Sequence, residues 1–280
     1  MFQQQSLAGF LAWLVLCVTC VLPTSAQLPS LDEPPWLGYF AAYDNNRYQL
    51  GVTSNGAILL DILNHKGSPL SKDLQIPIII AIQETTADGK VTTKNIRPKS
   101  LISTDQPSEK LEKITIKGQI TGNTAFEIVV EQLRGTILIG GHLTSSVAAK
   151  NPTQFHLQVK IPKLYSNVSK LEKKTLKILE KEIARDRISL SYTDGKRKKW
   201  KTDEKVKLTD NEFIGSGISG IEMDFNAYKG RKIEFTTSPN AAIRLTDSKS
   251  GLLKDGFSIM WTPDITKDAD CKARLMIGVK

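Results

Sequence analysis

The chain has 280 residues and a formal net charge of +9, with 24% charged and 40% hydrophobic residues. This composition is that of a globular protein, and it excludes a long disordered segment or a disulfide-rich scaffold. The length suffices for one large domain or two small ones, and the sequence contains no internal repeat.

The N-terminal 26 residues have the features of a secretory signal. An uncharged apolar run over residues 7–22 precedes Thr24-Ser25-Ala26, small residues of the kind that signal peptidases recognise. A membrane anchor is the alternative, but the run is shorter than the roughly 20 residues that span a bilayer, and Pro23 ends it. We therefore expect cleavage after Ala26 and a secreted or periplasmic protein without a transmembrane segment.

The remaining sequence is dominated by strand signals. Residues 27–45 are expected to form an extended N-terminal segment, and residues 46–280 a single domain. Asn55-Gly56 lies between two alternating segments, which is a strong hairpin signal, and residues 75–83 form an apolar run suited to a buried strand. Short strands at intervals of about ten residues predict a mainly β fold, a large antiparallel β-sandwich of the supersandwich-like kind.

One segment, residues 168–186, has helical periodicity. Its apolar residues fall within about 160° of arc when successive residues are placed 100° apart. They are Val168, Leu171, Leu176, Ile178, Leu179 and Ile183. Ser166 or Asn167 is a candidate N-cap. This amphipathic helix could connect two sheets or separate two β-domains, and we favour one domain because no linker composition divides the chain.

In length and strand rhythm, the chain resembles the large β-sandwiches of the galactose mutarotase-like kind. Such sandwiches also occur as domains of polysaccharide lyases and glycosidases. The resemblance implies the fold alone, because no catalytic motif of that group is matched residue by residue.

The positive charge is concentrated in residues 159–207, which hold 16 Lys and Arg against 7 Asp and Glu. On the predicted helix, five lysines share about 100° of arc opposite the apolar face. They are Lys170, Lys173, Lys174, Lys177 and Lys181. Lysines four residues apart destabilise a helix by roughly 0.2–0.5 kcal/mol per pair, which indicates a functional role. A solvated face tuned for solubility is the alternative.

The second basic element is the stretch SYTDGKRKKWK, residues 191–201. With a two-residue turn at Asp194-Gly195, the side chains of Lys196, Lys198 and Trp200 share one face. A slip of one residue would exchange the faces. An aromatic ring among cations suits a sugar that carries carboxylate or sulfate, whereas the alternative is that Trp200 anchors the hairpin on the core.

Together, the helix and the hairpin supply the candidate ligand-binding residues. They are Lys173, Lys177, Lys181, Tyr192, Lys196, Arg197, Lys198, Lys199 and Trp200. A basic patch with aromatics also fits single-stranded nucleic acid, which an exported protein seldom meets. We therefore expect non-catalytic binding of an acidic polysaccharide or an anionic cell-surface polymer. A third interpretation is a structural envelope protein or a subunit that docks an acidic protein.

The enzyme alternative rests on the histidines. His142 and His156 lie in predicted neighbouring strands and could approach each other, whereas His65 is expected in an exposed turn. Nearby carboxylates could complete an acid–base site of a carbohydrate-active isomerase, lyase or hydrolase. The candidates are Glu127, Glu131 and Asp224.

Three other features favour structural roles. Residues 215–220 match the spacing G-x-G-x-x-G, but a strand-like segment follows, so we expect a loop between strands and no dinucleotide site. The aspartates of residues 264–270 are too few to bind calcium and are expected in a solvated turn. Cys271 is expected to be a buried packing residue at the start of the last strand. We expect neither a cofactor nor a metal.

Overall fold

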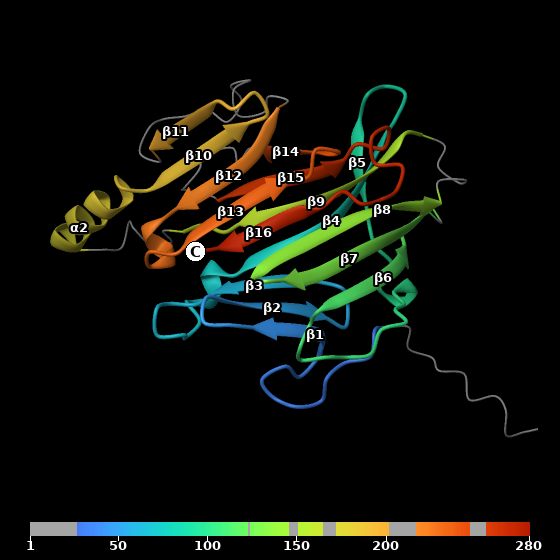
Figure 1. Ribbon diagram of the computed structural model, residues 1–280, viewed down its shortest axis with the longest axis horizontal. Helices are drawn as coiled ribbons and strands as arrows, with labels where there is room; N and C mark the ends of the chain where they lie inside the picture. Colours follow the sequence, from blue (N-terminus) through green and yellow to red (C-terminus); the bar gives the residue numbers. More distant parts are fainter. Residues whose placement is uncertain (1–26, 123, 146–150, 165–171, 202–216, 247–255) are drawn as a thin grey trace, which may run out of the picture.

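The computed structural model describes residues 27–122, 124–145, 151–164, 172–201, 217–246 and 256–280. The predicted signal segment lies outside these residues. Two antiparallel sheets of eight strands pack against each other around a shared apolar core (Figure 1), which confirms the predicted β-sandwich. None of the described helices is both long enough and apolar enough to cross a bilayer.

The first sheet has the strand order β1-β2-β3-β4-β9-β15-β14, and β5 also pairs with β4. Its strands are β1 (Tyr39–Asp44), β2 (Tyr48–Thr53), β3 (Ile58–Ile62), β4 (Ile76–Thr85), β5 (Val91–Lys94), β9 (Thr153–Ile161), β14 (Ala241–Thr246) and β15 (Phe257–Pro263). The predicted Asn55-Gly56 hairpin joins β2 to β3, with Gly56 at a φ of 82°. β1 lies within residues 27–45, so part of the expected lead-in belongs to the sheet.

The second sheet has the strand order β11-β10-β12-β13-β16-β8-β7-β6. Its strands are β6 (Lys113–Gln119), β7 (Ala125–Leu133), β8 (Thr136–Ser145), β10 (Arg187–Tyr192), β11 (Arg197–Lys201), β12 (Ile218–Asp224), β13 (Lys232–Thr237) and β16 (Leu275–Val279). The last strand, β16, lies between β13 and β8. Neither sheet is therefore built from one half of the chain alone.

The core forms because alternate residues of most strands point inward. In β10, Ile188 and Leu190 are fully buried, whereas Ser189 and Ser191 between them face outward. Trp261 is completely buried, and its indole Nε1 donates to the Thr237 hydroxyl at 3.0 Å, which satisfies its polar group. On β10, the outer face of the second sheet thus carries two serines.

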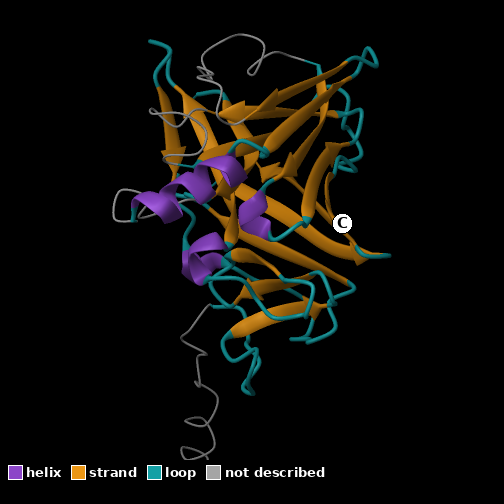
Figure 2. Cartoon of the chain, turned by 90° about the vertical axis from the view of Figure 1, so that its left-hand side faces the viewer, coloured by secondary structure: helices purple, strands orange, loops and turns teal. Residues whose placement is uncertain are grey.

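The helix α2 (Lys173–Ile183) lies at one end of the sandwich, directly before β10 (Figures 1 and 2). The predicted helix began at residue 168, and residues 165–171, including both candidate N-caps, lie outside the described part. Ile178, expected on a buried face, is 54% exposed, whereas Leu179 and Ile183 are half-buried. The packed side of the helix is therefore narrower than predicted. Short 3-10 helices are η1 (Lys72–Leu74), η2 (Pro98–Ser100) and η4 (Asn226–Tyr228).

Candidate functional site

The β10–β11 hairpin has a register one residue away from the one that a two-residue turn would give. Ser191 pairs with Arg197, and residues 193–195 form a three-residue loop. The Tyr192 amide donates to the Lys196 carbonyl at 2.9 Å, and Gly195 has a φ of 83°, as a turn with a glycine bulge requires. The prediction of a two-residue turn was wrong because the glycine closes a longer loop.

This register decides which hairpin cations face outward. Arg197 lies opposite Ser191, and Lys199 lies opposite Ser189, so both cations join the serines on the exterior face. Both side chains are exposed. Arg197 and Lys199 therefore form the outward basic face of the hairpin. The predicted register had instead placed Lys196, Lys198 and Trp200 together on one face.

The other candidate residues of the hairpin have different environments. Lys196 lies at the tip, where its ammonium is 2.9 Å from the Asp194 carboxylate and lowers the pKa of that carboxyl. Lys198 is half-buried, and the half-buried ring of Tyr192 packs against the core. The backbone of Trp200 belongs to β11, but its side chain lies outside the described residues.

The basic helix and the hairpin tip lie at opposite ends of β10. The chain enters β10 directly after α2 and leaves it at the tip, so about 20 Å of strand separates them (Figure 1). The candidate helix residues Lys173, Lys177 and Lys181 are exposed. The basic segment thus forms two surfaces, one on α2 and one on the outer face of the second sheet.

A groove of about 290 Å³ runs along that outer face beside the hairpin, and we call it the sheet groove. Two rows of laterally neighbouring residues on four strands line it. The rows are Lys199, Ser189, Glu222 and Glu234, and Arg197, Ser191, Gly220 and Thr236.

The floor of the sheet groove consists of small residues. Ser189 and Ser191 occupy β10, and Gly220 occupies the neighbouring position on β12. A Cβ atom on Gly220 would lie 3.3 Å from the Thr236 methyl group, so a larger residue would begin to fill the groove. The strands that carry the two walls, β11 and β12, are next-nearest neighbours and therefore about 10 Å apart.

The walls carry opposite charges. Within the described part of the chain, neither Arg197 nor Lys199 has an ion-pair partner, and Glu222 accepts no hydrogen bond. Glu234 pairs with the Lys280 ammonium at 2.6 Å. Glu222 and Glu234 stand directly opposite each other on β12 and β13, an arrangement of like charges that destabilises a sheet. Among the residues that the structure describes, Arg197 and Lys199 thus have no ion-pair partner, whereas Glu222 interacts with the nearby Lys232 ammonium, whose pKa Asp224 and then Glu222 raise.

The acidic wall was missed by sequence reasoning. Glu222 alternates with the buried residues Ile221 and Met223, so its outward position could have been read from the sequence. The pairing of β12 with β10 could not be predicted in this way. A long segment separates β11 from β12 in the sequence, so local pattern does not show which strand β12 pairs with.

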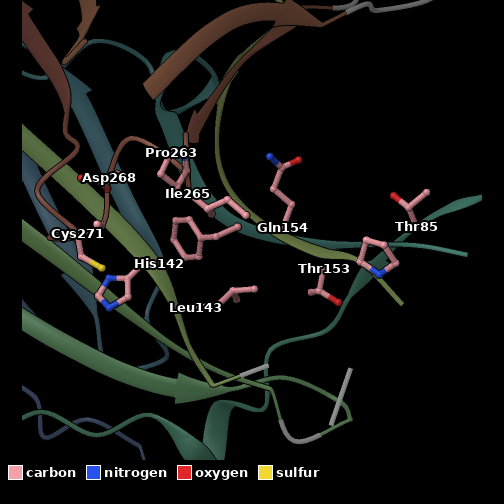
Figure 3. A pocket seen from close by; sticks show the side chains of 12 residues that line it. Thr85, His142, Leu143, Thr153, Gln154, Pro263, Ile265, Asp268 and Cys271 are labelled. Atoms are coloured by element: carbon pink, nitrogen blue, oxygen red, sulfur yellow. The ribbon is translucent and has the colours of Figure 1, made fainter. Parts of the chain in front are cut away.

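A second cavity, of about 450 Å³, lies at the end of the sandwich, and we call it the end pocket (Figure 3). Its apolar wall includes Leu143, Phe155 and Ile265, and its polar side includes His142 and Cys271. Figure 3 shows the Cys271 sulfur directed toward the His142 ring. An apolar cavity with a few polar groups is the usual form of a small-molecule site.

The two candidate histidines lie on different sheets. β8, which carries His142, belongs to the second sheet, whereas β9, which carries His156, belongs to the first. His142 lies opposite Glu127 in the neighbouring strand, as one version of the enzyme hypothesis requires. Glu131 lies four residues farther along β7, and Asp224 lies on β12. The prediction that His142 and His156 lie in neighbouring strands was wrong because the chain changes sheets between them.

His156 has a structural environment. It is 2% exposed, and its Nδ1 atom is 2.6 Å from the Thr262 hydroxyl. Burial, together with the nearby Arg244 guanidinium, lowers the pKa of the imidazole to about 4. The ring is therefore neutral at physiological pH. His65 lies in an exposed turn, as expected.

Cys271 differs from its predicted role. It lies in the loop before β16 with a φ of 55° and is half-buried. Burial, and then the nearby carboxylates of Asp268, Glu127 and Asp270, raise the pKa of its thiol. Because the thiolate is the reactive form, this thiol is a weak nucleophile at neutral pH.

The aspartates of residues 264–270 were expected in a solvated turn, but Asp268 is buried. Its carboxylate accepts hydrogen bonds from the amides of Lys272 and Ala273, both at 2.8 Å, and from the Asn240 side chain. Asp268 thus fixes the loop that borders the end pocket. Within the described ranges, no group of three or more His, Cys, Asp or Glu side chains has a metal-binding arrangement.

The glycine motif of residues 215–220 leads into a strand. Residues 215 and 216 lie outside the described part, and Ile218 to Gly220 form the start of β12. The helix that a dinucleotide site needs at this point is absent from these described residues.

No protein-family model and no curated protein matches the chain significantly.

Proposed function

We propose that the protein binds an acidic glycan, or another hydroxyl-bearing anionic cell-surface polymer, in the sheet groove without catalysis. The observation that carries this proposal is the pair of cations Arg197 and Lys199, which have no ion-pair partner among the described residues, across a small-residue floor from the carboxylate of Glu222. A ligand with both acidic and hydroxyl groups complements both walls.

The chemistry of the walls matches such a ligand. The Arg197 guanidinium presents a planar set of donors that suits carboxylate or sulfate, and Lys199 adds a compact positive charge. On the other wall, the carboxylate of Glu222 accepts hydrogen bonds from hydroxyl groups. The hydroxyls of Ser189 and Ser191 both donate and accept, so the floor can bind a sugar ring in several orientations.

The position of the groove also supports a polymer. It lies on an outer sheet face and is not enclosed by the core, so a chain could extend beyond it. Expected partners in an exported setting are acidic polysaccharides and anionic envelope polymers, and the basic segment would bring them to the surface by long-range attraction.

The test is retention on immobilised alginate or heparin at 0.15 M salt. The double variant R197E/K199E should bind at least about 10-fold more weakly, because two charge-assisted contacts become repulsive. The matched control is K110E/K113E, which makes the same change in net charge at exposed positions by the opposite edge of the second sheet.

Equal weakening of both double variants would show that retention reflects net charge alone. A groove variant that binds as well as the wild type would exclude the sheet groove. Thermal unfolding of each variant checks that the fold is intact.

A further inference from the structure

The outward face of α2 is a second charged surface that the proposed glycan site does not use. Five exposed residues span about 140° of arc around the helix. They are Lys173, Lys174, Lys177, Ile178 and Lys181, and we call them the helix face. Within the described residues, none of these four lysines has an ion-pair partner.

The helix face is held outward by the attachment of α2 to the sandwich. At the C-terminal end, the Arg187 guanidinium donates to the carbonyls of Ala184 and Asp186 at 2.8 and 2.7 Å. The buried carboxylate of Asp186 accepts a hydrogen bond from the backbone amide of Asn226 at 2.8 Å. Half-buried Leu179 and Ile183 occupy the other side of the helix. Figure 1 shows α2 at the end of the sandwich, beyond β10, and in Figure 2 this end faces the viewer.

Several features of α2 are unfavourable for an isolated helix. Lys173 and Lys174 place positive charge in the first turn, where the helix dipole favours negative charge. The N-cap residue, Glu172, makes no capping hydrogen bond with its side chain within the described residues. Lys173 and Lys177, and Lys177 and Lys181, are like-charged neighbours one turn apart. Ile178 exposes 54% of its surface beside these charges.

A single kind of partner relieves all of these features. Negative charge near the helix removes the repulsion among the lysines and the unfavourable interaction with the dipole. An adjoining apolar layer gives Ile178 a place to be buried. Anionic lipid headgroups above an acyl boundary offer both, whereas a soluble acidic glycan offers only the charge.

We propose that the helix face docks on the surface of an anionic lipid bilayer. The lysines contact the headgroups, Ile178 enters the boundary with the acyl chains, and the sandwich stays in water. This surface is separate from the sheet groove, so the inference does not depend on glycan binding.

The test is flotation of the full chain with vesicles of equal phosphatidylglycerol and phosphatidylcholine, compared with pure phosphatidylcholine. Because residues 1–26 are apolar and would bind either vesicle, the readout is the difference between the two compositions. The wild type should bind the anionic vesicles preferentially. K177E/K181E should lose on the order of 25-fold or more in affinity, since each lysine contributes about 5-fold near such a surface.

Two controls make the result specific. K110E/K113E, with the same change in net charge, should bind as the wild type does. I178A should bind the anionic vesicles about 5-fold more weakly than the wild type. I102A changes a residue that is 60% exposed in another part of the surface, and its affinity for the vesicles should be unchanged. If K177E/K181E fails to fold, judged by its thermal unfolding, K177Q/K181Q replaces it, with a smaller expected loss.

Three outcomes would overturn the proposal. They are equal binding to both vesicle compositions, wild-type binding by the lysine variants, and loss in the lysine variants without any loss in I178A. The last outcome would assign the helix face to a soluble polyanion. Retention on alginate by the helix variants tests the sheet groove separately, so either proposal can fail alone.

Discussion

At the scale of single residues, His156 gives the protein a defined acid sensitivity. Its folded-state pKa of about 4 lies below the ordinary value of 6.5, so the unfolded chain binds the extra proton first as the pH falls. The contribution of His156 to the free energy of unfolding is fully present above pH 6.5, and it falls by about 3 kcal/mol as the pH decreases to 4. In H156Q, where no imidazole must remain neutral, this decrease should disappear.

Urea unfolding of wild type and H156Q between pH 7 and pH 4 measures the effect. H65Q is the control, because His65 is exposed and its replacement should leave the pH profile unchanged. A H156Q profile that still falls as steeply as the wild type would assign the acid sensitivity to other groups.

Two buried tyrosines provide a second residue-scale prediction. Among the described residues, the Tyr228 hydroxyl is buried without a hydrogen-bond partner, and burial raises its pKa. The Tyr48 hydroxyl, also buried, is 2.7 Å from the Gln132 amide. Y228F should therefore be neutral or stabilising by about 1 kcal/mol, whereas Y48F should cost about 1 kcal/mol. Thermal or urea unfolding compares them, and a marked loss in Y228F would reveal a partner for that hydroxyl.

The sequence largely predicted which side chains of a strand point inward and which point outward. It did not predict which residues of other strands or loops they contact. Alternation in β10 places the serines outward and the leucine inward, as the structure has them. The burial of Asp268 and the left-handed backbone of Cys271 follow from how one loop folds back on itself, which local pattern does not reveal. Sequence reasoning therefore found the basic half of the sheet groove and missed Glu222 and Glu234.

At the scale of elements, the turns explain which predictions succeeded. Asn55-Gly56 and Asp194-Gly195 both mark hairpins, and in both the glycine closes a three-residue loop, residues 54–56 and 193–195, although a two-residue turn was predicted at Asp194-Gly195. An Asp-Gly pair fits both a two-residue turn and a three-residue loop. The choice between them moves every side chain of β11 to the other face. Helical periodicity found α2, but periodicity alone could not show that Ile178 lies on the exposed side.

The turn at Gly256 yields an element-scale prediction. Gly256 has a φ of 76°, and a Cβ atom there would overlap the Ile161 carbonyl oxygen and lie 3.0 Å from the Pro162 carbonyl carbon. G256A should cost about 2–5 kcal/mol, because backbone strain and overlap add at the start of β15. The control G89A, at a φ of 79° with open space around it, should cost only about 1 kcal/mol. Equal losses in the free energy of unfolding of G256A and G89A, measured with urea, would mean that the backbone around residue 256 shifts and relieves the overlap.

At the scale of the whole molecule, the class of fold was predictable and the strand order was not. Regular spacing of short alternating segments indicated a large sandwich. The placement of β16 between β13 and β8, and of β9 between β4 and β15, joins segments far apart in the chain. Such pairings depend on how both sheets fill one core, so no local signal specifies them. The same topology divides the basic segment into the helix face and the sheet groove.

A crystal structure with a uronic acid hexasaccharide would show whether the sheet groove holds the acidic glycan. We expect ordered sugar over Ser189, Ser191 and Gly220, with a carboxylate about 3 Å from the Arg197 guanidinium and a hydroxyl on Glu222. Sugar ordered in the end pocket or against α2, with the sheet groove empty at a concentration that saturates binding in solution, would exclude the sheet groove as the glycan site.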